Sequence, residues 1–154
     1  MSSQIKDIIG VRSFVLITGA SRGFGRAIAL ELGKVVGAGS TLLLMARNRA
    51  DLETTKEIVR DARPGLAVEV ECIDLATADK ETFERSVRAN YGSADHEVAL
   101  VIHNAGTLGQ DGRKITVSKE YLVVKNQYTV CPRSLGPFYI VKTVCIIVSN
   151  DSLV

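Results

Sequence analysis

The chain has 154 residues, of which 46% are hydrophobic and 23% charged, so it is long enough for about one domain with a buried core and too apolar to be disordered. The 19 Lys and Arg residues and 17 Asp and Glu residues leave a formal net charge of +2, far below the basic excess typical of proteins that bind nucleic acid or anionic lipid. We therefore expect neither nucleic acid nor a membrane as a partner.

Two hydrophobic periods alternate along the first two thirds of the chain. Short apolar runs typical of buried strands are followed by stretches with helical spacing. In chain order we predict strand 13–17, helix 26–36, strand 41–45, helix 50–62, strand 66–73, helix 78–91 and strand 98–102. Gly37 and Gly39 end the first helix, and Pro64-Gly65 ends the second.

The second and third predicted helices carry apolar residues on one face. Leu52, Ile58 and Val59 are expected to face the core from the second helix, and Phe83 and Val87 from the third. Because the strands are nearly continuously apolar and alternate with helices, the order predicts a parallel sheet with right-handed crossovers and helices on both faces.

The composition changes near Glu120. The segment 121–154 has only three basic residues and one acid, but it contains two of the three cysteines and two of the three prolines. The runs 121–124 and 139–148 favour strands, yet no amphipathic helix of adequate length separates them. We therefore divide the chain into residues 1–120 and an atypical tail, 121–154, to which we assign no role in the sheet.

A glycine-rich turn follows the first predicted strand, with the sequence Thr18-Gly19-Ala20-Ser21-Arg22-Gly23-Phe24-Gly25. Gly19 permits the tight turn, Gly23 lets the backbone approach phosphates, and Gly25 lets the next helix pack closely. A helix that begins near Gly23 presents free N–H groups and a positive dipole end to an anion. Because the turn joins a strand to a helix, it predicts a dinucleotide pyrophosphate site, with a plain strand–turn–helix connection as the alternative. The predicted cofactor-binding residues of this loop are Gly19, Ser21, Arg22, Gly23, Phe24 and Gly25.

The second predicted strand ends in Ala46-Arg47-Asn48. A site that prefers NAD has an acid near this point to bind the ribose 2′-hydroxyl, whereas Arg47 can pair with a 2′-phosphate, and Arg22 can reach the same group. The pattern therefore predicts NADP (NADPH) as the cofactor, with Arg47 and Asn48 among the residues that bind it. A solvated surface charge is the alternative for each arginine.

The ends of the third and fourth predicted strands supply the remaining candidates. The carboxylate of Asp74 can accept from the amine of adenine, but Asp74 is explained equally well as the cap of a turn or helix. After the fourth strand, small residues allow the backbone to approach the cofactor ribose, and Asn104 can brace neighbouring strands. The predicted cofactor-binding residues here are Asp74, Leu75, Asn104, Ala105 and Gly106. We expect a structural role for His103 and a simple loop position for His96.

The three cysteines are odd in number and widely spaced. They form neither a metal motif nor a disulfide framework, which favours a reducing compartment. The polar segment 1–7 lacks the features of a secretory signal, and no apolar stretch reaches the ~18 residues of a membrane span. We therefore expect a cytoplasmic protein without a metal site.

Three motifs together resemble the short-chain dehydrogenase/reductase family: Thr18-Gly19-x-x-x-Gly23-x-Gly25, Asp74-Leu75 and Asn104-Ala105-Gly106. The run ITGASRGFGRAIA, the strand end Ala46-Arg47-Asn48 and the run Gly106-Thr107-Leu108-Gly109 are most similar to the sepiapterin reductases of that family. The likeness covers roughly residues 11–112 and departs at His103, where the family usually has Asn.

The resemblance implies a Rossmann-like, doubly wound parallel sheet, truncated here, in which residues 1–120 are the NADP-binding part. It also implies an NADPH-dependent carbonyl reductase whose substrate is a small molecule, a pterin in the sepiapterin reductases, on the way to tetrahydrobiopterin. A homo-oligomer is a further expectation from the family.

Members of the family use a catalytic Ser, together with a Tyr and a Lys separated by three residues. Tyr121 and Lys125 have this spacing, but the residues between them are strand-prone, and Ser118 is too close in sequence to be the partner. We therefore assign no catalytic residue and expect the chain to be weakly active or inactive. The alternatives are a non-enzymatic NADP-binding fragment and an unstable product without a function of its own.

Overall fold

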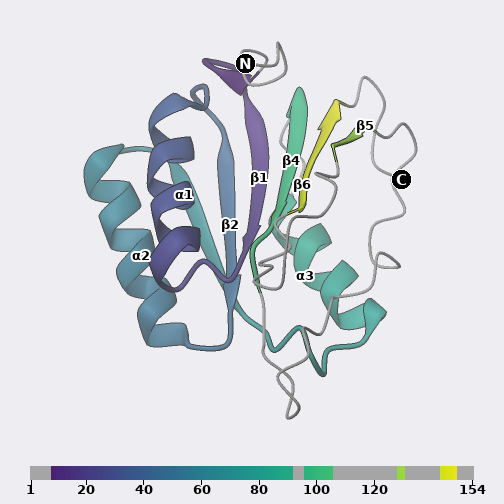
Figure 1. The fold of residues 1–154 in the computed structure, drawn as a ribbon. Coiled ribbons are helices and arrows are strands. Elements are labelled where there is room, and N and C mark those ends of the chain that lie inside the picture. The colour runs from purple at the N-terminus through teal and green to yellow at the C-terminus, as the bar shows by residue number, and fades with distance from the viewer. Residues whose placement is uncertain (1–7, 92–95, 106–127, 131–142, 149–154) are drawn as a thin grey trace, which may run out of the picture.

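The computed structural model describes residues 8–91, 96–105, 128–130 and 143–148. These residues form three helices and a sheet whose strand order is β3-β2-β1-β4-β6-β5 (Figure 1). The strands are β1 (Ser13–Thr18), β2 (Thr41–Ala46), β3 (Ala67–Cys72), β4 (Val98–His103), β5 (Tyr128–Val130) and β6 (Thr143–Val148). The helices are α1 (Gly23–Val35), α2 (Arg49–Ala62) and α3 (Lys80–Tyr91). None of these helices is long and apolar enough to cross a membrane.

The first four strands are parallel, as the alternation of strands and helices predicts. β1 lies between β2 and β4, and β3 pairs with the other side of β2. Each of these four strands begins and ends within one residue of its predicted position. The Rossmann-like, doubly wound fold class is thus confirmed for this part of the chain.

Helices cover both faces of the parallel sheet, with α1 and α2 over one face and α3 over the other (Figure 1). Successive residues of a strand point to opposite faces, so β1 contributes to two cores. Val15 and Ile17 pack with Ala29, Leu52 and Val59 of α1 and α2. On the opposite face, the core contains Phe14, Leu16, Leu43, Met45 and Phe83, with Val87 packed against it as predicted.

The buried face of α2 differs from the prediction at one position. Leu52 and Val59 are fully buried as expected, but Ile58 is 36% exposed. Thr55 takes the inward place instead and is fully buried. The helix is rotated so that positions 52, 55 and 59 face α1 and the sheet, which is the i, i+3, i+7 stripe of an amphipathic helix.

The tail contributes to the sheet, a role that the sequence did not suggest. β6 lies within the β-prone run 139–148 and pairs antiparallel with β4, so the sheet is mixed. β5 pairs antiparallel with β6. The pairing satisfies the backbone groups on the side of β4 that faces away from β1, where an open edge would leave them exposed. The other β-prone run, 121–124, lies outside the described residues.

Candidate functional site

The carboxyl ends of β1, β2 and β4 meet at one edge of the sheet, because the three strands are parallel and adjacent. In the register, Thr18 lies opposite Met45 on β2, and Ile17 lies opposite Ile102 on β4. After β1 the chain forms β2 on one side of β1, and it later forms β4 on the other side of β1. A point where the strand order reverses in this way is where ligands bind in open parallel sheets.

Thr18 joins the ends of β1 and β4. Its buried hydroxyl Oγ1 accepts hydrogen bonds from the backbone N–H groups of Asn104 and Ala105, both at 3.0 Å. The side-chain Nδ2 of Asn104 donates to the carbonyl oxygen of Gly19 at 3.2 Å. The bracing role predicted for Asn104 is therefore confirmed, while the cofactor contacts of Asn104 and Ala105 stay predictions.

The first turn of α1 has the features that a bound phosphate requires. Arg22 occupies the N-cap position without a capping hydrogen bond from its side chain, and the first turn contains no acid. Gly23 has φ +55°, and a Cβ placed there would meet nothing within 4 Å. A helix N-terminus without a side-chain cap, beside open space, fits a dinucleotide pyrophosphate. Arg22 and Phe24, both exposed, flank Gly23 in this loop.

Gly25 lets α1 pack directly against the turn that leaves β1. A Cβ at Gly25 would lie 2.1 Å from the carbonyl oxygen of Gly19 and 2.7 Å from Nδ2 of Asn104. Gly19 itself has φ +67° and lies against the backbone of Ala105. The roles predicted for Gly19 and Gly25, a tight turn and close helix packing, are thus confirmed.

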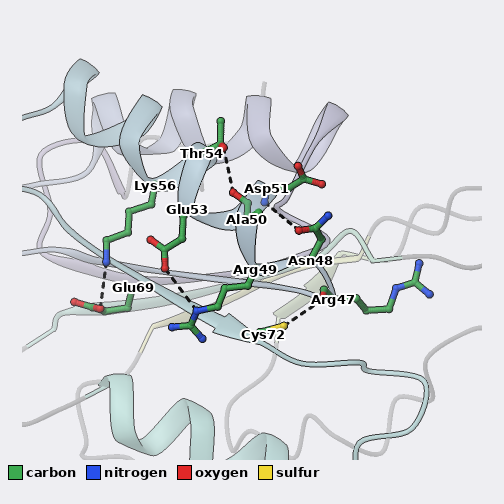
Figure 2. Close-up of polar contacts among 10 residues, drawn as sticks. All are labelled: Arg47, Asn48, Arg49, Ala50, Asp51, Glu53, Thr54, Lys56, Glu69 and Cys72. Carbon is green, nitrogen blue, oxygen red and sulfur yellow. Dashed lines mark hydrogen bonds and ion pairs between the residues drawn. The ribbon is translucent and has the colours of Figure 1, made fainter.

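Arg47 extends from the end of β2, away from its neighbours (Figure 2). Its side chain is exposed and forms no ion pair among the residues that the structure describes. The neighbouring Arg49 differs, since its Nε lies 3.9 Å from Oε1 of Glu53 (Figure 2). The Arg47 carbonyl oxygen accepts a hydrogen bond from Sγ of Cys72 at 3.1 Å, which ties this strand end to β3. The Arg47 guanidinium is thus available to an anionic ligand.

Three of the predicted cofactor-binding residues also have local structural roles. Asn48 caps α2, because its Oδ1 accepts from the N–H of Asp51 at 3.2 Å (Figure 2). Asp74 caps a turn, with Oδ1 accepting from the N–H of Ala76 at 3.0 Å, which is the second of the two roles that the sequence allowed. Leu75 packs partly buried against the core under α3. Their contacts with a cofactor stay predictions.

His96 lies in a loop, as predicted, but the expectation of a simple loop residue is wrong. Its side chain is buried, and its ring centroid lies 5.7 Å from that of Phe14 and 5.1 Å from that of Tyr91. Its Nε2 lies 3.3 Å from Oγ1 of Thr41. The aromatic neighbours and the hydroxyl come from β1, β2 and α3, so the loop position is buried by segments distant in sequence.

His103 is the last residue of β4. Its Nε2 is buried without a hydrogen-bond partner among the described residues, and burial lowers the pKa of its imidazole from the usual 6.5. The folded chain therefore disfavours the protonated ring. The structural role expected for His103 stays a prediction.

We expect the free energy of unfolding to fall as the pH is lowered from 7.5 to 5.5, and to fall less in the His103→Gln variant. The pKa of His103 is lower in the folded chain than in the unfolded chain, so its stabilising contribution is full above pH 6.5 and is lost as the pH falls through the folded pKa. Urea unfolding at several pH values measures the effect. Identical pH dependence in the parent and the variant would contradict it.

Sequence reasoning missed Arg26 and Thr55, which lie directly behind the glycine-rich loop. Nε of Arg26 donates to Oγ1 of Thr55 at 2.9 Å, and Nη2 of Arg26 donates to the carbonyl oxygen of Ser21. Two signals were available. Arg26 places a cation in the first turn of a helix, where acids are favoured, and Thr55 falls on the apolar stripe of α2.

Several candidates fall outside the described residues: Gly106, Ser118, Tyr121 and Lys125. Within the part of the chain that the structure describes, no three His, Cys, Asp or Glu side chains are close enough together to hold a metal ion.

The chain matches one family model and is similar to several known proteins. The sequence model of the family described as short chain dehydrogenase matches residues 13–132. The sepiapterin reductase of Meriones unguiculatus is 36% identical over 116 residues, which cover 75% of this chain and 44% of that protein. The sepiapterin reductase of Rattus norvegicus is 38% identical over 112 residues, which cover 72% of this chain and 40% of that protein. This chain therefore spans less than half the length of either relative.

The fold has a counterpart among solved structures. A short chain dehydrogenase of Shigella flexneri matches with a TM-score of 0.50 and 27% sequence identity, over 67% of this chain and 43% of that chain.

Proposed function

Since this chain belongs to the short-chain dehydrogenase family, we propose that it binds NADPH at the carboxyl edge of its parallel sheet and serves the reduction of a small carbonyl compound. The motif likeness to this family, and to its sepiapterin reductases, is borne out by the relatives. NADPH, when bound, supplies the hydride for such a reduction.

The observation that carries the proposal is the first turn of α1. Its N–H groups have no side-chain cap, no acid lies in the turn, and Gly23 faces open space. The pyrophosphate of the cofactor fits the open space beside Gly23, because a helix N-terminus attracts negative charge. Thr18 and Asn104 hold the two strand ends beside this turn.

The preference for NADPH over NADH follows from charge at the end of β2. Arg47 is exposed and unpaired within the described residues, and it occupies the place where an NAD-binding protein has an acid. A guanidinium binds a phosphate through two parallel, charge-assisted hydrogen bonds. Arg22, exposed in the glycine-rich loop, adds a second cation.

The proposed substrate class is a pterin with a carbonyl side chain, after the relatives named sepiapterin reductase. Because this chain spans less than half their length, cofactor binding and catalysis are tested separately. The cytoplasm is the proposed compartment, in keeping with the free, exposed thiol of Cys72.

We expect NADPH to bind more tightly than NADH by about 1–3 kcal/mol, or roughly 5- to 150-fold, the range of a charge-assisted contact. Arg47→Ala should remove most of this difference, because it removes the partner of the 2′-phosphate and leaves the pyrophosphate site intact. Fluorescence titration of the parent and the variant with both cofactors measures it. A second assay follows NADPH consumption with and without sepiapterin.

Arg49→Ala is the matched control, since Arg49 lies two residues away on the same edge but is paired with Glu53. It should leave the ratio of the two affinities unchanged within about twofold. Equal binding of NADPH and NADH by the parent protein would overturn the cofactor assignment.

A further inference from the structure

The glycine-rich loop is tied to α2 by Arg26, a half-buried residue of the first turn of α1. Its guanidinium donates from Nη2 to the carbonyl oxygen of Ser21 and from Nε to Oγ1 of Thr55 at 2.9 Å. Nη2 also lies 3.5 Å from the carbonyl oxygen of Asp51 at the start of α2. Arg26, which belongs to α1, thus links the loop to α2.

Thr55 extends this connection from the α2 side. Its hydroxyl is fully buried and lies 3.0 Å from the carbonyl oxygen of Ala20 and 3.3 Å from that of Ser21. The hydroxyl has a single hydrogen to donate, and the carbonyl oxygen of Asp51 also lies 3.0 Å from it, whereas Nη2 of Arg26 donates to the carbonyl oxygen of Ser21. Thr55 and Arg26 together therefore place the carbonyl groups of Ala20 and Ser21 toward α2. In a planar trans peptide the N–H points opposite to the C=O. The N–H groups of Ser21 and Arg22 are therefore directed away from α2.

The charge of Arg26 is unexpected at this place. Cations are unfavourable in the first turn of a helix, where the dipole is positive. No carboxylate forms an ion pair with Arg26 within the described residues, and its donors reach hydroxyl and carbonyl oxygens instead. Such a half-buried, uncompensated cation beside the loop is favourable when the loop holds an anion.

We propose that Arg26 and Thr55 are positioning residues that hold the glycine-rich loop in its phosphate-binding shape. The proposal rests on the proposed function, since it assigns these residues to the pyrophosphate part of the same cofactor site. A loop held in shape before binding does not lose conformational entropy when the ligand arrives, so affinity is higher. The connection acts on the pyrophosphate, which NADPH and NADH share, and not on the 2′-phosphate.

The test measures dissociation constants for NADPH and NADH, and urea unfolding, in the full chain. Arg26→Met removes the charge and the hydrogen-bond donors. Arg26→Lys keeps the charge but cannot bond to Ser21 and Thr55 at the same time, as the guanidinium does. Thr55→Val removes only the hydroxyl. Arg60→Met is the matched control for Arg26→Met, because Arg60 is exposed in the last turn of α2. Val59→Ala is the control for lost stability, since Val59 is buried on the same helix.

We expect Arg26→Met to weaken both cofactors about tenfold or more and by the same factor, and Thr55→Val to weaken both about threefold or more. Arg26→Lys should recover only part of the loss, because an ammonium cannot hold both oxygens in the fixed directions of a guanidinium. Val59→Ala should lower stability while changing the affinity for each cofactor less than twofold. Arg60→Met should change neither the stability nor the two affinities.

Three results would overturn the proposal. The first is full recovery of cofactor affinity in Arg26→Lys, and the second is unchanged affinity in Thr55→Val. The third is a loss of cofactor affinity in Val59→Ala as large as that in Arg26→Met. Failure of the proposed function is a separate outcome, in which the parent protein binds neither cofactor. Parent binding that persists unchanged in all the Arg26 and Thr55 variants removes this inference alone.

Discussion

Gly25→Ala should lower the free energy of unfolding by about 3 kcal/mol or more, a large part of the stability of a domain of this size. The added Cβ would lie 2.1 Å from the carbonyl oxygen of Gly19 and 2.8 Å from its carbonyl carbon. That carbonyl oxygen also accepts from Nδ2 of Asn104, so the backbone cannot move aside without breaking the contact between β1 and β4. Helix α1 must shift away from the sheet, which opens the core around Ala29.

Gly23→Ala, two residues earlier, is the matched control. A Cβ at Gly23 would meet nothing within 4 Å, so the only cost is the positive φ of +55°, about 1–2 kcal/mol. Urea unfolding of the two variants and the parent gives the comparison directly. If Gly25→Ala were no more destabilised than Gly23→Ala, the close packing of α1 on the β1 turn would not be structurally important.

Gly23→Val should abolish measurable NADPH binding, with affinity falling about 100-fold or more, while the chain stays folded. The branched side chain would fill the open space in front of the first N–H groups of α1, where the pyrophosphate is proposed to lie. Apart from the chain neighbours of Gly23 and the backbone of α1, no atom of the described residues lies within 4 Å of the added Cβ, so the fold is not crowded. Titration with NADPH, alongside circular dichroism and urea unfolding, separates the loss of binding from the loss of structure.

Gly65→Val controls for backbone strain. Gly65 has φ +87°, also faces open space, and lies between α2 and β3, outside the glycine-rich loop. The Gly65→Val variant should lose about as much stability as Gly23→Val and keep its NADPH affinity within about twofold of the parent. Unchanged NADPH binding in Gly23→Val would mean that the glycine-rich turn is a structural connection only, the alternative that the sequence left open.

The motif residues could be predicted because their roles depend on local backbone geometry. Gly19 and Gly23 both adopt a positive φ, and Gly25 lies against backbone. These conformations and close contacts require glycine, and the spacing of the glycines within a strand–turn–helix unit predicts them. Asn48 and Asp74 were also found from the sequence, but short polar side chains at strand ends serve as caps as well, and the structure shows those capping bonds.

Contacts between distant segments could not be predicted in the same way. Thr55 meets the carbonyl oxygen of Ala20 across 35 positions, and Arg26 meets Thr55 across 29. Both depend on how α1 and α2 pack side by side, and a rotation of α2 moves Ile58 outward and Thr55 inward. His96 is likewise buried by aromatic rings from β1 and α3. No local pattern encodes which side chain faces which neighbour across such distances.

The sequence by itself determined the parallel core, because hydrophobic burial imposes a period of two or 3.6 residues on each strand or helix and glycine punctuates the turns. Only the tertiary structure decided the antiparallel addition of β6 to β4 and the position of Thr55 and Arg26 behind the loop. Strand pairing satisfies backbone hydrogen bonds that every residue carries, so a β-prone run such as 139–148 does not specify its partner or direction. Those choices depend on which edges and faces the rest of the fold leaves open.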